Sequence, residues 1–128
     1  MTLTVPDFSP FRILVAGDAM LDEYLFGDTR RISPEAPVPI VKTRTTEQRP
    51  GGATNVALNV AALGGQVRLL AIVGDDARAE VLTQLLSSAG VDCEFIEASG
   101  LATIHKLRVL SRNQQLIRLD SEEPLAGH

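Results

Sequence analysis

The 128-residue sequence has one cysteine, Cys93, no tryptophan, and only 4% aromatic residues. A single cysteine cannot form a disulfide within the chain or supply a cysteine-based zinc centre. The chain adds only two histidines, so we do not expect it to hold a metal ion.

Long apolar runs and an excess of positive charge are also missing. No stretch approaches the roughly 18 apolar residues of a membrane span, and residues 1–10 lack the basic and apolar regions of a secretory signal. The 12 basic residues are outnumbered by 16 acidic ones, for a net charge of −4, which disfavours nucleic-acid binding. We expect a cytoplasmic chain of one domain at most, with no membrane or nucleic-acid partner.

Short apolar runs alternate with helical patterns along much of the chain. Buried strands are predicted at residues 12–18, 67–73 and 91–98. Helices are predicted over residues 53–63 and 77–89, each followed by glycine. The first helix is apolar nearly all round, so we expect it to be buried on all sides. This alternation indicates an α/β fold with a largely parallel sheet.

Two segments depart from this alternation. Residues 28–50 contain Pro34, Pro37, Pro39 and Pro50, and proline belongs in loops or edge strands because it lacks a backbone donor. We expect this segment to lie outside the main sheet. Residues 104–120 read as a β-hairpin around a polar turn.

Polar residues near two predicted element ends are candidate ligand-binding groups. Asp22 follows the first strand, where ligands bind in open α/β sheets, although it could equally be a solvated loop residue. Gly51 and Gly52 precede the first helix, either as a tight turn or to let a ligand approach the helix N-terminus. Asn55 would then face a polar ligand or bond to nearby backbone.

The predicted hairpin is basic, and the chain lacks the common nucleotide motifs. Residues 104–119 contain Lys106, Arg108, Arg112 and Arg118 and no acidic residue. These side chains either bind a phosphate or form a solvated face neutralised by the acidic residues that follow. Neither a G-x-G-x-x-G dinucleotide motif nor a P-loop occurs.

The segments GDAMLD at residues 17–22 and GGATNVA at residues 51–57 resemble the N-terminal half of ribokinase-like carbohydrate kinases. Longer stretches resemble one branch, the bacterial kinases of D-glycero-β-D-manno-heptose 7-phosphate. They are RISPEAPVP at residues 31–39, RPGGA at 49–53 and KLRVLSRNQQLIRLD at 106–120. The resemblance covers residues 12–123, and its long motifs make it specific.

The resemblance implies the N-terminal portion of a ribokinase-like three-layer sandwich, with a small β lid formed by about residues 22–48 and 104–120. It implies a complete kinase that uses ATP and Mg²⁺ to phosphorylate the anomeric hydroxyl of heptose 7-phosphate, in ADP-heptose synthesis for the lipopolysaccharide core. In this family the catalytic Asp and the ATP pocket belong to a C-terminal half. We therefore expect no catalytic residue and no bound cofactor in this chain, and no turnover by it alone.

The resemblance also identifies candidate site residues and partners. Its sugar-binding motif falls on Asp22, Gly51, Gly52 and Asn55. From charge alone, we assign the substrate's phosphate to Lys106, Arg108 and Arg118. Lids in this family pair between subunits, which implies a homodimer. The rival hypothesis is a non-catalytic module that binds a sugar phosphate or dimerises through an exposed sheet edge.

Overall fold

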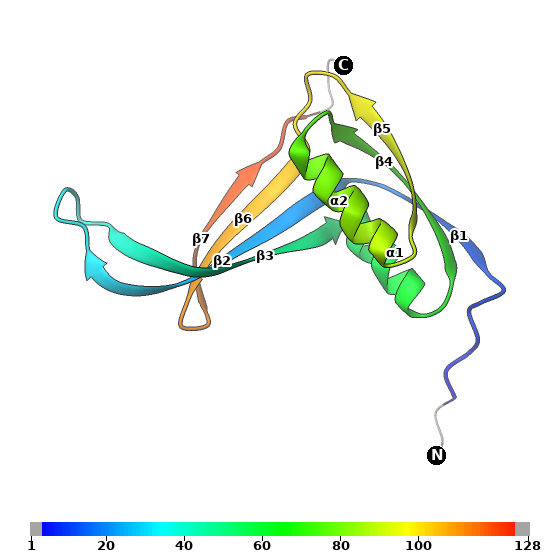
Figure 1. Cartoon of the computed structure of the whole chain (residues 1–128), viewed down its shortest axis with the longest axis horizontal. Coiled ribbons are helices and arrows are strands. Elements are labelled where there is room, and N and C mark those ends of the chain that lie inside the picture. The colour runs from blue at the N-terminus through cyan, green and yellow to red at the C-terminus, as the bar shows by residue number, and fades with distance from the viewer. Residues whose placement is uncertain (1–3, 125–128) are drawn as a thin grey trace.

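The computed structural model describes residues 4–124, which form two sheets and two helices (Figure 1). The parallel sheet has the order β1-β4-β5 and contains β1 (Arg12–Ala16), β4 (Gln66–Gly74) and β5 (Asp92–Ala98). The second sheet, here called the lid, has the order β3-β2-β6-β7 and contains β2 (Ala19–Ile32), β3 (Pro39–Gly52), β6 (Ile104–Ser111) and β7 (Gln114–Ser121). The helices are α1 (Ala53–Ala62) and α2 (Ala77–Ser88). The expected α/β fold class is confirmed.

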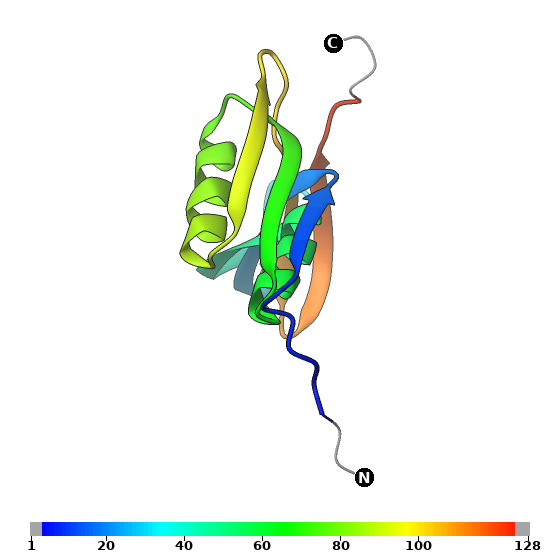
Figure 2. The same cartoon turned by 90° about the vertical axis from the view of Figure 1, so that its right-hand side faces the viewer.

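Both helices pack on one face of the parallel sheet (Figure 2). Alternate residues of β4 point to that face and are buried with Leu82 and Leu86 of α2. On the opposite face Leu14, Ile72 and Ile96 remain exposed, because no element within residues 4–124 covers them. The chain therefore supplies two layers of an α/β sandwich. Neither of the two helices in these residues is long and apolar enough to cross a bilayer.

Helix α1 is less buried than its apolar sequence predicts. Thr54 and Ala57 are its buried residues, whereas Val56 is half exposed. The helix contacts β4, β3 and β1, and more weakly β2 and α2, but these neighbours do not enclose it. The expectation of a helix buried on all sides is therefore wrong.

Strands β2 and β3 form a long antiparallel arm that projects from the body of the molecule (Figure 1). Each has 14 residues, and both lie outside the parallel sheet, as expected for residues 28–50. Pro39 and Pro50 lie within β3, which tolerates them because it is an edge strand of the lid. At Gly27 the strands approach so closely that a Cβ would lie 2.6 Å from the Lys42 carbonyl oxygen.

The Asp76 side chain joins the body to the lid. As the N-cap of α2, its carboxylate accepts from the Ala79 N–H at 3.0 Å. It also accepts from the Thr103 N–H at 2.8 Å, next to the start of β6. Burial acts to raise the pKa of Asp76, but hydrogen bonds from Thr103 and Ala79 and the charge of Arg78 outweigh it, and the pKa is lowered.

We predict that Asp76→Ala lowers the free energy of unfolding at pH 7 by about 2 kcal/mol, because it removes a cap and a charged hydrogen bond. A carboxylate with a lowered pKa stabilises the fold fully above its ordinary pKa of 3.8. That contribution is lost as the pH falls through the lowered value. Denaturant unfolding followed by circular dichroism at pH 7 and pH 3 measures this.

The matched control is Asp75→Ala, which changes the exposed neighbour of Asp76. It should leave the unfolding free energy within about 0.5 kcal/mol of the original. Equal losses for the two variants would contradict the role assigned to Asp76.

Candidate functional site

A polar pocket lies where the lid meets the N-terminus of α1. Its floor comes from the end of β3 and the first turns of α1, and its wall comes from β2. The lining residues are Asp22, Tyr24, Gln48, Arg49, Pro50, Gly51, Gly52, Asn55 and Leu58. The structure thus brings together the four residues of the expected sugar-binding motif in one pocket.

Two glycines make the close packing at this floor feasible. Gly52 has a φ of 60° and is the N-cap residue of α1, a conformation that favours glycine. A Cβ on Gly52 would lie 2.6 Å from the Asp18 carbonyl oxygen, and one on Gly51 would lie 2.5 Å from Asp22 Oδ2. The Ala53 N–H donates to that Asp18 oxygen at 2.9 Å, which anchors the helix to the turn after β1.

Asp22 faces an arginine across the lid. Its Oδ1 lies 2.9 Å from Arg108 Nη1, and the side chains are only 17% and 18% exposed. Among residues 4–124, neither atom has a partner that meets the geometry of a hydrogen bond, so the contact is an ion pair. Burial acts to lower the pKa of Arg108, but Asp22, with Tyr24 and Asp120, raises it above its ordinary value.

Tyr24 lies between two guanidinium groups. The Cζ atoms of Arg49 and Arg108 are 4.6 and 5.2 Å from the centroid of its ring, within the range of cation–π attraction. Phe26 stacks on the same ring with centroids 6.2 Å apart. Sequence reasoning did not select Tyr24 or Arg49. A signal was present, since Asp22, Tyr24 and Phe26 alternate on one face of β2.

The other two predicted phosphate ligands, Lys106 and Arg118, lie close to acidic side chains. Arg118 is directly opposite Arg108, but its guanidinium bonds to both carboxylate oxygens of Asp120, at 2.8 and 2.9 Å. Lys106 Nζ lies 3.8 Å from Asp120 and 3.9 Å from Glu122. Lys106, Arg108 and Arg118 share the face of the lid that carries Asp22, yet none of them lines the pocket.

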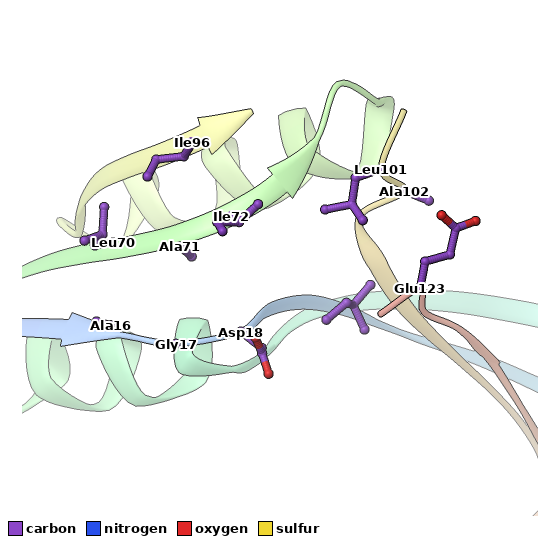
Figure 3. Close-up of a pocket in the computed structure, with 11 residues that line it drawn as sticks. Ala16, Gly17, Asp18, Leu70, Ala71, Ile72, Ile96, Leu101, Ala102 and Glu123 are labelled. Carbon is purple, nitrogen blue, oxygen red and sulfur yellow. The ribbon is translucent and has the colours of Figure 1, made fainter. Parts of the chain in front are cut away.

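A second hollow lies on the uncovered face of the parallel sheet (Figure 3). Apolar side chains such as Leu70, Ile72 and Ile96 form most of it, and the carboxylates of Asp18 and Glu123 lie at its margin. This apolar lining gives little to bind a sugar, so the pocket around Asp22 is the better candidate site.

Comparison with known proteins identifies relatives of the whole chain. The model of the "pfkB family carbohydrate kinase" matches residues 11–123. The bifunctional protein HldE of Alkalilimnicola ehrlichii is 61% identical over 127 residues, and that of Psychromonas ingrahamii is 57% identical over the same length. Each match covers 99% of this chain and 27% of the relative. The chain therefore spans about a quarter of the length of these proteins.

Solved structures agree with this relationship. A carbohydrate kinase from Agrobacterium tumefaciens superposes with a TM-score of 0.73 and 27% identity, over 87% of this chain and 35% of that one. A ribokinase from Arabidopsis thaliana, complexed with ribose and ATP, shares the fold with a TM-score of 0.67 and 20% identity, over 84% of this chain and 35% of that one. Since the family model spans nearly all the described residues and the pocket holds the motif expected from the sequence, the chain belongs to the pfkB family of carbohydrate kinases.

Proposed function

We propose that the chain forms the sugar-binding and lid part of a kinase that phosphorylates the anomeric hydroxyl of D-glycero-β-D-manno-heptose 7-phosphate. The pathway would be ADP-heptose synthesis for the lipopolysaccharide core. The observation that carries the proposal is a carboxylate, Asp22, held between a glycine-lined floor and the guanidinium of Arg108. This set suits a ligand with hydroxyls at one end and a phosphate at the other. The identity to HldE proteins supports the choice of a heptose.

In this proposal four residues of the pocket bind the sugar, and basic residues beside the pocket bind its phosphate. Asp22 accepts hydrogen bonds from sugar hydroxyls, and the Asn55 amide both donates and accepts. Gly51 and Gly52 let the sugar ring approach the backbone because they have no side chains. Arg108 binds the phosphate, and Lys106 and Arg118 add positive charge behind it.

The chain would act on the acceptor side of the reaction only. In the complete kinase, ATP supplies the phosphoryl group and Mg²⁺ neutralises its developing charge. The residues described here orient the sugar, and the lid excludes water from it. We assign no catalytic base to this chain. Because the reaction consumes ATP, we place it in the cytoplasm.

A second candidate function is a non-catalytic module that binds sugar phosphate or dimerises through the lid. It is favoured by Ile117 and Leu119 on β7, which are both half exposed. They alternate with Arg118 and so lie on the lid face turned away from the pocket. A second copy of the chain would cover them. Light scattering that finds a monomer at high protein concentration would argue against this candidate.

We predict that Arg108→Ala weakens binding of heptose 7-phosphate about 10- to 100-fold, because a charged hydrogen bond to the phosphate is lost. Titration calorimetry with heptose 7-phosphate measures this. The matched control is Arg44→Ala, which breaks a lid ion pair with Asp28 away from the pocket. An equal loss in both variants, or none in Arg108→Ala, would contradict phosphate recognition by Arg108.

We also predict that the purified 128-residue chain, given ATP, Mg²⁺ and heptose 7-phosphate, forms no bisphosphorylated sugar above the uncatalysed rate. The physical reason is that the site holds only the acceptor, whereas phosphoryl transfer needs both reactants positioned. Phosphorus NMR of the reaction mixture measures the product. Product formation that depends on the chain would contradict the proposal that this chain binds only the acceptor sugar.

A further inference from the structure

The ion pair of Asp22 and Arg108 occupies one atom of each group that a sugar phosphate would bind. While it persists, Oδ1 is less able to accept from a sugar hydroxyl and Nη1 is less able to donate to an anion. At 2.9 Å, Oδ1 and Nη1 lie against each other instead. The free protein thus holds its two substrate-binding groups together.

This ion pair is incomplete. Both atoms are buried, and neither makes a hydrogen bond with any part of the chain that the structure describes. Buried charges are costly unless hydrogen bonds complete their surroundings. A hydroxyl donor at Asp22 and an anionic acceptor at Arg108 would complete both groups at once.

The ring of Tyr24 gives the Arg108 guanidinium a second interaction partner. The guanidinium of Arg108 already lies 5.2 Å from the ring centroid, and the ring is packed against Phe26. Arg49, 4.6 Å from the same centroid, adds a second guanidinium at this point. It is half exposed and pairs with Glu47 at the surface, a kind of ion pair that contributes little and that an anion can replace. An anion bound beside Tyr24 would therefore lie near two guanidinium groups.

We propose that Arg108 is a latch on Asp22 that phosphate releases. An anionic group bound by Arg108 and Arg49 beside Tyr24 draws the guanidinium from the carboxylate, and Asp22 then accepts the sugar hydroxyls. The inference rests on the proposed function in one respect, that this pocket binds a sugar phosphate. It goes beyond that function by linking recognition of the two ends of the ligand.

The latch makes binding of the two ends reciprocal. If an anion raises the affinity for a sugar by some factor, the sugar must raise the affinity for the anion by the same factor. A sugar without a phosphate has to break the ion pair without replacing it, so it binds weakly. Selectivity for phosphorylated sugars then arises because Arg108 competes with the sugar hydroxyls for Asp22, and no steric clash is needed.

The test is titration calorimetry with unphosphorylated heptose, with and without saturating inorganic phosphate. In the unaltered chain, phosphate should strengthen heptose binding about 10-fold, within the usual range for coupled sites. Arg108→Ala and the bulkier Arg108→Met should bind heptose about 10-fold more tightly than the unaltered chain does without phosphate. Phosphate should no longer change their affinity. Arg44→Ala, the control, should keep the coupling.

Two results would overturn the latch. One is an unaltered chain whose affinity for heptose is the same with and without phosphate. The other is a pair of Arg108 variants that bind heptose no more tightly than the unaltered chain. Tight binding of heptose 7-phosphate in either case would leave the proposed function standing.

A further result would contradict the proposed function and leave the latch to be tested by itself. If the unaltered chain binds neither heptose nor heptose 7-phosphate, the proposed function is wrong. The latch is then judged by nitrogen-15 NMR of the arginine side chains during titration with inorganic phosphate alone. A shift of the Arg108 Nε signal supports it, and an unmoved signal overturns it.

Discussion

Two glycines let the end of β3 lie against the start of β2, and the site depends on that contact. A Cβ at Gly51 or Gly52 would collide with Asp22 or with the Asp18 backbone. The contact sets the register that places Arg49 opposite Asp22, and it starts α1 at the pocket floor. The parallel pairing of β2 with β6 then brings Arg108 level with Tyr24. One backbone constraint therefore places side chains from four elements.

Charged side chains on the lid form pairs that differ in burial. Exposed or partly exposed pairs are Arg44–Asp28, Arg49–Glu47, Arg118–Asp120 and Lys106–Asp120. Pairs of this kind contribute little to stability. The pair beside the pocket, Arg108–Asp22, is more than four-fifths buried, and His105, which contacts Glu23 at 2.9 Å, is buried as well. Desolvation of a charged pair is costly at such positions. The position of the Arg108–Asp22 pair fits a role in binding better than a role in stability.

Local patterns in the sequence predicted the body of the fold, because a buried strand and a capped helix are defined within about ten residues. The glycines that follow α1 and α2, Gly64 and Gly90, are of this kind, and both have a positive φ. The exposure of α1 could not be predicted. The pattern shows which of its residues are apolar, but it does not show which other elements pack against the helix.

The register between strands, which brings the site residues together, could not be predicted from the sequence. Tyr24 and Arg49 belong to strands whose pairing is shifted twice along the arm, so their proximity cannot be read from spacing. Lys106 and Arg108 are two residues apart in one strand and so share a face of the lid. This spacing could not show that Asp120 binds Arg118 through both oxygens, a contact that only side-chain geometry reveals.

The parallel pairing of β2 with β6 also bears on how the chain folds. Thr29 and Ser111 hydrogen-bond at 2.9 Å although they are 82 positions apart, with both helices between them. Closing so long a loop is entropically expensive and slow, whereas the β2–β3 arm is a local hairpin. The arm can form first, and until β6 arrives β2 presents an unpaired edge that can join another chain. The strand that carries Asp22 is therefore also the one most exposed to misassembly during synthesis.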